Sequence, residues 1–311
     1  MLRTLHRLAG WLLVLLVPAA WAAPCPPPLA QPSLAQLQAA QLHDRGLLWR
    51  IERDGRSSYL YGTLHVGKPE WQAPGPRVAE ALARSDVLAL EIDPSDPGVQ
   101  NELATTPGKP PALPAALQRR LARQLAAACL AEGAFGAMHP ALQAVMLGVL
   151  EARWAGLDPS YAQEYALARW ARERGRRIVA LETVAQQKKA LVPGEDGPAL
   201  ALIEQTLAQL EAGSGRSAVA RLASAWERGD LATLENHEQW CDCVRNDEER
   251  AAMRALNDER NPALAERIDA VHREGRRLFA AVGALHMTGP QSLPRLLAAR
   301  GFRVERVVFG P

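Results

Sequence analysis

The sequence predicts a mixed α/β protein in which strands from both ends of the chain form one central sheet around a large helical middle section. Strand-like apolar runs occur between residues 47 and 93 and again between 277 and 309, whereas residues 114–270 are rich in alanine, leucine, arginine and glutamate. A G-x-x-H sequence also occurs twice, at Gly62–His65 and at Gly283–His286. Since apolar strand faces must be buried, we expect a sheet built from the N- and C-terminal repeat units, with the helices packed against it.

The composition is that of an ordinary packed protein. The chain has 311 residues, of which 48% are hydrophobic, 23% charged and 5% aromatic. It is therefore long enough to bury a sizeable core and too apolar to be disordered. Its 23 glycines and 23 prolines follow no collagen-like period, which excludes a fibrous class.

Residues 1–22 have the pattern of a secretory signal peptide. Arg3 and Arg7 precede an apolar run from Leu8 to Ala20, and Ala20-Trp21-Ala22 is a small-residue cleavage pattern. The run is shorter than the roughly 20 residues of a spanning helix, so we expect cleavage near Ala22 and no transmembrane anchor afterwards. The sequence thus predicts an exported protein, periplasmic or secreted.

The net charge of the chain limits the kinds of partner that the protein could bind. Without Arg3 and Arg7, the 36 basic residues become 34, equal to the 34 acidic residues. Nucleic-acid binding needs a basic patch or stripe, and none is evident, so we exclude that class. The expected partner is a peptide or small-molecule substrate, and the oligomeric state is left open.

The four cysteines are Cys25, Cys129, Cys241 and Cys243. An even number in an exported protein favours disulfides. A bond between Cys241 and Cys243 would close a very small ring, so we expect one of them to pair with Cys25 or Cys129. A zinc or redox C-x-C site is the alternative, but a second cysteine pair at ligand spacing is missing.

A proline-rich lead-in at residues 23–46 precedes what we expect to be a single domain at 47–311. The domain should begin with a hairpin, Leu47–Glu52 and Ser58–Tyr61, joined by the Asp54-Gly55 turn. We then expect a helix at Pro76–Arg84 and a strand at Val87–Asp93.

The helical section, residues 114–270, has one clear interruption. Arg176–Glu182 is expected to be a buried strand between helices. The chain should end with a strand at Arg277–Val282, a helix at Ser292–Arg300 and a strand at Phe302–Phe309. Each G-x-x-H segment ends a predicted strand and is followed by a predicted helix and a second strand. This shared order favours a duplicated unit over coincidence.

The two repeated histidines, His65 and His286, each follow the end of a predicted strand. Strand ends in a helix-flanked sheet line the crevice where ligands bind, and the preceding glycine allows a sharp turn or a close approach. A histidine there offers a neutral nitrogen ligand or a general base. Two histidines in equivalent settings predict a functional site where the two repeat units meet.

Two glutamates have the same setting. Glu91 ends the apolar run at Val87–Leu90, and Glu182 ends the run at Ile178–Leu181. A carboxylate is costly to bury unless it is paired or ligates a metal. Two histidines and two glutamates could hold a divalent ion with an open position for water, and a non-ligating glutamate could take the proton of that water. In the alternative, the glutamates pair with arginines and the histidines are structural.

At this point the chain resembles the TraB/PrgY/GumN family, whose animal relatives are the Tiki metalloproteases. The resemblance extends from about residue 45 to the C-terminus and rests on short motifs that occur in order. They are Gly62-Thr63-Leu64-His65, Leu90-Glu91-Ile92-Asp93, Gly156-Leu157-Asp158, Ala180-Leu181-Glu182-Thr183 with Gln186 or Gln187, Arg260-Asn261, and Val282-Gly283-Ala284-Leu285-His286 followed by Gly289-Pro290 and Gly301-Phe302.

The resemblance implies a divalent-metal-dependent hydrolase, related in fold to erythromycin esterase-like and ChaN-like proteins, and most specifically a peptidase that uses manganese, cobalt or zinc. It implies His65, His286 and Glu91 as metal ligands, and Glu91, Glu182 and Arg260 as catalytic residues. Which glutamate ligates and which acts as base stays open. Arg260 would orient a carboxylate or the substrate.

Two other classes compete with the metallohydrolase. One is a non-catalytic protein that binds haem or a peptide, and the other is a metal-independent esterase in which a histidine is the general base. A G-x-S-x-G elbow and an H-E-x-x-H helix are both missing from the sequence, so serine-hydrolase and zincin classes have no support. We expect Glu164 on a solvated helical face and His237 among charged helical residues, neither with a functional role.

Overall fold

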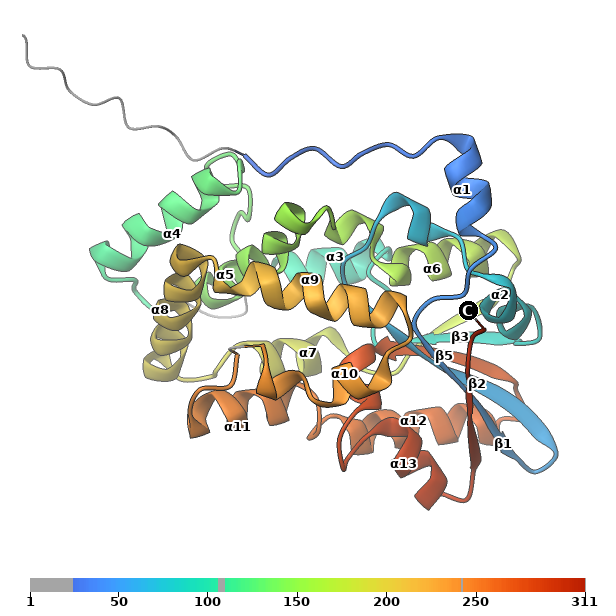
Figure 1. Ribbon diagram of the computed structural model, residues 1–311. Coiled ribbons are helices and arrows are strands. Elements are labelled where there is room, and N and C mark those ends of the chain that lie inside the picture. The colour runs from blue at the N-terminus through green and yellow to red at the C-terminus, as the bar shows by residue number, and fades with distance from the viewer. Residues whose placement is uncertain (1–24, 106–109, 242, 311) are drawn as a thin grey trace, which may run out of the picture.

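The computed structural model describes residues 25–105, 110–241 and 243–310, and the expected signal peptide at residues 1–22 lies outside the described residues. Its centre is a six-stranded sheet in the order β4-β3-β5-β2-β1-β6 (Figure 1). The strands are β1 (Leu47–Arg53), β2 (Arg56–Thr63), β3 (Val87–Leu90), β4 (Arg177–Ala180), β5 (Leu278–Gly283) and β6 (Arg303–Val307).

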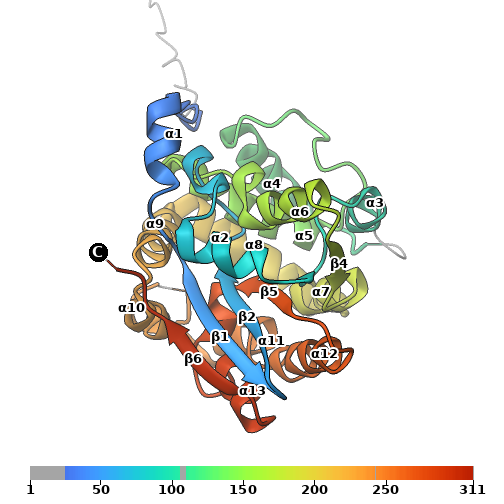
Figure 2. The same ribbon diagram turned by 90° about the vertical axis from the view of Figure 1, so that its right-hand side faces the viewer.

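The two ends of the chain build this sheet together, which confirms the predicted fold class. β1 and β2 form the antiparallel hairpin, and its turn residues Asp54 and Gly55 have positive φ values of 52° and 70°. β6 adds antiparallel to the outer side of β1, while β5 inserts parallel between β2 and β3 (Figure 2). The strands β2, β5, β3 and β4 are therefore parallel, and their carboxyl ends meet at one edge.

Helices cover both faces of the sheet. In both views α12 and α13 lie on one face, and α2, α6 and α9 lie on the other (Figures 1 and 2). The helices are α1 (Leu34–Ala40), α2 (Pro76–Ala83), α3 (Pro97–Ala104), α4 (Ala115–Ala127), α5 (Pro140–Leu150), α6 (Gln163–Glu173), α7 (Val184–Leu191), α8 (Asp196–Ala212), α9 (Ser214–Glu227), α10 (Leu231–Glu235), α11 (Asp247–Leu256), α12 (Asn261–Arg273) and α13 (Leu293–Ala299).

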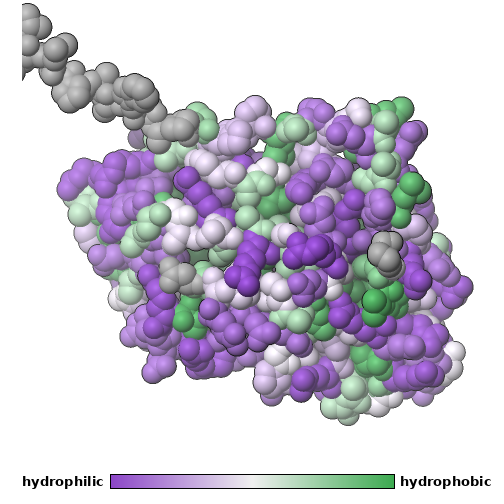
Figure 3. All heavy atoms as spheres, viewed as in Figure 1, coloured by the Kyte–Doolittle hydropathy of each residue, from purple (hydrophilic) through white to green (hydrophobic). Residues whose placement is uncertain are grey.

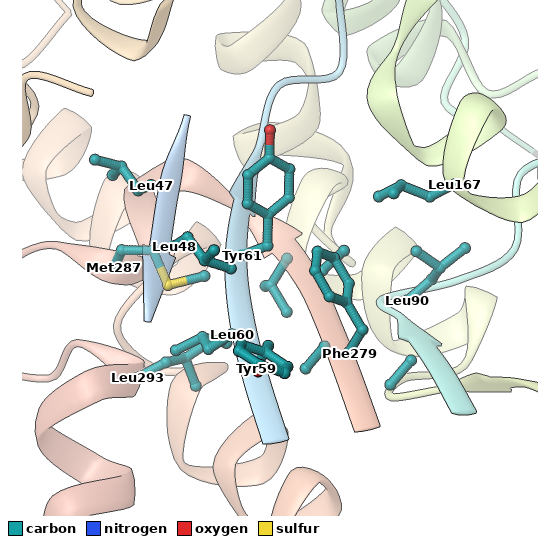
Figure 4. Packing of buried hydrophobic residues seen from close by; sticks show 14 of the residues in the cluster. Leu47, Leu48, Tyr59, Leu60, Tyr61, Leu90, Leu167, Phe279, Met287 and Leu293 are labelled. Carbon is teal, nitrogen blue, oxygen red and sulfur yellow. The ribbon is translucent and has the colours of Figure 1, made fainter. Parts of the chain in front are cut away.

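The main hydrophobic core encloses the sheet. On one face Leu167 of α6 lies beside Leu90 and Phe279, and on the other Leu293 lies beside Leu60 (Figure 4). A second cluster of buried side chains joins α4, α5 and α8, away from the sheet. On the surface, hydrophilic residues predominate and hydrophobic ones form small separate groups on the face seen in Figure 3.

The strand expected at Arg176–Glu182 exists but is not buried as predicted. β4 spans Arg177–Ala180 at the edge of the sheet, where only Val179 is buried and the neighbouring residues are partly or fully exposed. Since an edge strand has a neighbour on one side only, its apolar run is covered less than that of an inner strand. The strand expected at Val87–Asp93 also ends early, at Leu90.

The expected disulfide pairing is wrong. Cys25 pairs with Cys129, with their Cα atoms 5.7 Å apart, and Cys241 pairs with Cys243, with Cα atoms 5.0 Å apart. Both separations lie within the usual range for disulfides, so the short spacing of Cys241 and Cys243 does not prevent their pairing. Neither disulfide lies among the predicted site residues.

Across the ranges that the structure describes, no helix combines the length and the apolar character needed to cross a membrane.

Candidate functional site

The predicted site residues meet at the carboxyl edge of the parallel strands. His65 follows the end of β2, His286 follows β5 and Glu91 follows β3 directly. Glu182 follows β4, and its backbone N–H donates to the Glu91 carbonyl at 2.9 Å. Because these strands are parallel neighbours, side chains far apart in the sequence converge at this edge.

Arg260, which immediately precedes α12, binds both glutamates. Its Nη2 lies 2.6 Å from Glu91 Oε2, and its Nε lies 2.9 Å from Glu182 Oε1, with a second bond from Nη2 to the other Glu182 oxygen. Glu91 and Glu182 are only 6% and 7% exposed. A guanidinium that bridges two buried carboxylates supplies the pairing that their burial requires.

Glu91 is held in its ionised form. Burial by itself raises the pKa of Glu91, but the charges of His286, His65 and Arg260 outweigh burial, and the pKa falls to about 2. The backbone N–H of Gly283 also donates to Glu91 Oε1, at 2.7 Å. Burial likewise opposes the charge of Arg260, yet Glu182 and Glu91 raise the pKa of Arg260 above its ordinary value.

Gln187 completes the support of the two carboxylates. Its Nε2 lies 3.1 Å from Glu91 Oε2 and 3.4 Å from Glu182 Oε2. The sequence resemblance named Gln186 or Gln187 as part of the motif that contains Glu182, and it is Gln187 that contacts the carboxylates. From α7 it therefore donates to the same two carboxylate oxygens as Arg260 Nη2 does.

His286 is fixed in one tautomer. Its Nδ1 lies 2.7 Å from Asn261 Oδ1, while the amide nitrogen of Asn261 donates to the Gln291 carbonyl at 2.9 Å. The Asn261 oxygen is thus the acceptor, so Nδ1 carries the proton and Nε2 presents a lone pair, 3.3 Å from Arg260 Nη1. Burial lowers the pKa of His286 to about 4, so this imidazole is neutral at pH 7.

His65 is the exposed member of the group, with 63% of its side chain accessible. Its Nδ1 lies 3.1 Å from Glu164 Oε1, which also accepts a hydrogen bond from the Thr63 hydroxyl. The charge of Glu164 raises the pKa of His65 to about 9, so this imidazole is protonated at pH 7. Glu164 accepts from Nδ1, and Nε2 becomes a free nitrogen only once its own proton is lost.

Glu164 is the functional residue that sequence reasoning missed. It was expected on a solvated face, but it is 7% exposed and belongs to the first turn of α6. Asp158 explains its placement, because the Asp158 backbone pairs with Gly67 just after His65 and brings the start of α6 to the end of β2. Glu164 follows the Gly156-Leu157-Asp158 motif by a few residues, and this was the available signal.

Gly283 leaves a small space between the candidate residues. A Cβ placed on Gly283 would lie 3.4 Å from Glu91 Oε1, 3.5 Å from His65 Nε2 and 3.5 Å from His286 Cδ2. These are ordinary contact distances, so a methyl group would fill the space without displacing its neighbours. The absence of a side chain at Gly283 therefore leaves a small space that is bordered by Glu91 Oε1, His65 Nε2 and the ring of His286.

The chemistry of these donors fits a divalent cation. Both imidazoles bind an oxygen through Nδ1, which is typical of metal-binding histidines, and a carboxylate lies beside them. A metal ion at His65 would have to displace the proton of Nε2, because the pKa of this histidine is raised to about 9. In this structure the guanidinium of Arg260 forms ion pairs with the carboxylates of Glu91 and Glu182. Among residues 25–105, 110–241 and 243–310, no three His, Cys, Asp or Glu side chains have the spacing of a metal site.

The motifs in the sequence agree with the comparison to known protein families. The TraB/PrgY/gumN family model matches residues 47–306, and the chain belongs to this family. It is 26% identical over 250 residues to the uncharacterised protein YbaP of Shigella flexneri, a match that covers 78% of this chain and 88% of that protein. No solved structure gives a significant match.

Proposed function

We propose that this protein is an exported divalent-metal-dependent hydrolase, most specifically a peptidase. The observation that carries the proposal is the convergence of His65, His286 and Glu91 around the space at Gly283, with the Nδ1 of each imidazole bound to an oxygen acceptor. These three residues would hold the ion, whether manganese, cobalt or zinc. When bound, it would supply a Lewis acid that activates water and polarises the substrate carbonyl.

The remaining residues position charge and protons around that centre. Glu164 keeps the proton of His65 on Nδ1, and Asn261 does the same for His286. Arg260 and Gln187 hold the Glu182 carboxylate in place through hydrogen bonds, and a proton acceptor must be positioned in this way. The N–H groups of Arg260 already bind Glu91, Glu182, the Leu256 carbonyl and His286 Nε2, so its proposed role is to orient the two carboxylates.

A metal-independent hydrolase is the second candidate, and one contact favours it. The exposed imidazole of His65 is oriented through Nδ1 by Glu164, which is the pairing of a general base with its orienting carboxylate. In this case the neutral form of His65, which predominates above its pKa of about 9, would take a proton from water through Nε2, and Glu164 would stabilise the imidazolium that forms.

Hydrolysis assays with a chelator separate the two candidates. The signal-free protein is incubated with a mixed peptide library, with EDTA or with added manganese, cobalt or zinc, and the cleavage products are identified by mass spectrometry. The proposal predicts cleavage that EDTA abolishes and an added metal restores. Cleavage that resists EDTA would favour the second candidate, and no cleavage under any condition would contradict both.

Replacing Gly283 by alanine should block the site without unfolding the protein. The new methyl group makes only ordinary contacts with His65, Glu91 and His286, so we expect a melting temperature within a few degrees of the wild type. It occupies the space between the donors, so metal affinity should fall by about tenfold or more, as for other changes at the supporting shell. Competition titration with a chromophoric chelator measures this.

The matched control is Gly148→Ala, because no atom lies within 4 Å of the Cβ position there and Gly148 lies in α5, away from the site. This variant should bind metal like the wild type. Unchanged metal affinity in Gly283→Ala would contradict the assignment of this space to the ion.

A further inference from the structure

A cavity of about 360 Å³ lies on the α6 side of the sheet, between α6, α2 and the 3₁₀ turn at Pro69–Gln72. This volume is within the range of about 300–1,000 Å³ that is usual for small-molecule sites. Among the described residues that line the cavity, none is a candidate metal ligand. It is therefore a candidate binding site apart from the metal centre, and a ligand there goes beyond the proposed function.

The inner wall of the cavity is apolar. Tyr61 of β2 and Leu167 of α6 lie on the same face of the sheet, and the Tyr61 hydroxyl points away from its strand (Figure 4). Trp71 also belongs to this wall, and all three side chains are buried. The Tyr61 hydroxyl donates to the Arg45 carbonyl at 2.9 Å, and the Trp71 indole N–H donates to Glu227 Oε1 at 3.0 Å. Since these polar atoms already have partners, the wall mainly offers a ligand apolar surface.

The outer part of the cavity is formed by one face of α6. Ala166, Trp170 and Glu173 follow one another at helical spacing, so their side chains lie along the same side of the helix. Arg174 lines the same region, with its guanidinium 5.0 Å from the centre of the Trp170 ring and 3.5 Å from the Glu173 carboxylate. The charges of Arg174 and Glu173 therefore offset each other at this rim.

Arg169 is the remaining charged residue among the described residues of the lining. It belongs to the same stretch of α6, next to Trp170, and it is exposed. Its guanidinium has no hydrogen bond, ion pair or ring contact with any of the residues that the structure describes. A guanidinium keeps its charge at ordinary pH and can hold a carboxylate through two parallel N–H donors. The cavity thus combines an apolar wall with an unpaired cation.

We propose that this cavity binds a small carboxylic acid with an apolar body. The carboxylate pairs with Arg169 at the rim, and the apolar body is buried against Tyr61, Trp71 and Leu167. A ligand with an ammonium group would meet two guanidinium groups and only one carboxylate in the lining. A compact inorganic anion could pair with Arg169 but would leave the apolar wall in contact with water. An apolar acid is the class of ligand that uses both features.

Binding of linear acids of different length tests both parts of the site. The probes are hexanoate, octanoate and octanamide, and isothermal titration of the signal-free protein measures their affinities. Octanoate should bind about fifteenfold more tightly than hexanoate, which is the effect of burying two further methylene groups at about 0.8 kcal/mol each. Octanamide has the same chain without the charge, so it should bind about two- to fivefold more weakly than octanoate, the range for an exposed ion pair.

Two variants test the two parts of the site separately. Ala166 is partly exposed, so Ala166→Leu can extend into the cavity and should weaken octanoate binding by at least about fourfold, as if one methylene could no longer be buried. Arg169→Gln should remove the difference between octanoate and octanamide. The matched controls are Ala208→Leu on α8 and Arg267→Gln on α12, at exposed residues outside the cavity lining, and both should bind the probes like the wild type. Circular dichroism verifies that each variant is folded.

Four results would each overturn the proposal. They are no binding of octanoate, equal affinity for hexanoate and octanoate, unchanged octanoate affinity in Ala166→Leu, and an unchanged preference for octanoate over octanamide in Arg169→Gln. The titrations need neither a metal nor turnover, so their outcome is independent of the hydrolysis assay. Peptide cleavage without octanoate binding would leave the hydrolase proposal standing, and octanoate binding without cleavage would leave this site standing.

Discussion

Replacing Arg260 by methionine is expected to lower the free energy of unfolding by about 3–5 kcal/mol, because it removes the cation that is paired with two buried carboxylates. Glu91 and Glu182 are each nearly inaccessible, and Arg260 is the cation that contacts both. Methionine is close in length and apolar, so the change removes the charge while filling most of the volume. Urea denaturation at pH 7 measures the effect.

The destabilisation should depend on pH in a defined direction. The pKa of Glu91 falls from 4.5 to about 2 in the folded protein, so its ionised form contributes stability that is present above pH 4.5. That contribution is lost as the pH falls through about 2. The difference in stability between wild type and Arg260→Met should therefore shrink as the pH is lowered from 4.5 toward 2.

Arg267→Met is the matched control, because Arg267 is an exposed residue on α12, the helix that Arg260 precedes. Surface substitutions of this kind change stability by about 0.5 kcal/mol or less. An Arg260→Met protein as stable as this control at pH 7 would show that the two glutamates do not depend on the guanidinium.

Replacing Glu164 by glutamine is expected to reduce metal affinity and hydrolysis by about 10- to 100-fold, the usual effect of losing the carboxylate behind a metal-binding histidine. The glutamine keeps an oxygen near His65 Nδ1 but loses the charge that raises the pKa of His65. In the metal-free protein, the pKa of His65 measured by NMR should therefore fall.

Glu173→Gln is the control for this change, since Glu173 lies on the same helix and is exposed. It should leave both the pKa of His65 and the metal affinity unchanged. A Glu164→Gln variant with the wild-type pKa at His65 would mean that the contact between these side chains does not persist in solution.

Much of the fold could be predicted because its signals are local. The hairpin was marked by the Asp54-Gly55 turn, and the parallel strands by short apolar runs. A glutamate at the end of such a run marked the strand end for Glu91 and Glu182, and the repeated G-x-x-H segment marked it for His65 and His286, so all four could be placed at one edge of the sheet. Parallel pairing then brings them together without further sequence information.

The missed features depend on contacts between distant segments. Glu164 is polar and surrounded by other charged residues in sequence, and only the pairing of Gly67 with Asp158 turns it toward His65. The edge position of β4 and the two disulfides also follow from how distant segments pack. His237 is buried by packing around α10, although its neighbours in sequence are charged.

Metal content measured by plasma mass spectrometry tests the central claim most directly. The signal-free protein and a His65→Ala/His286→Ala double variant are each incubated with manganese, cobalt and zinc and then desalted. We predict close to one metal ion per wild-type chain and little in the variant. Equally low metal in both would contradict a metal-dependent hydrolase and leave the His65–Glu164 pair as the candidate catalytic group.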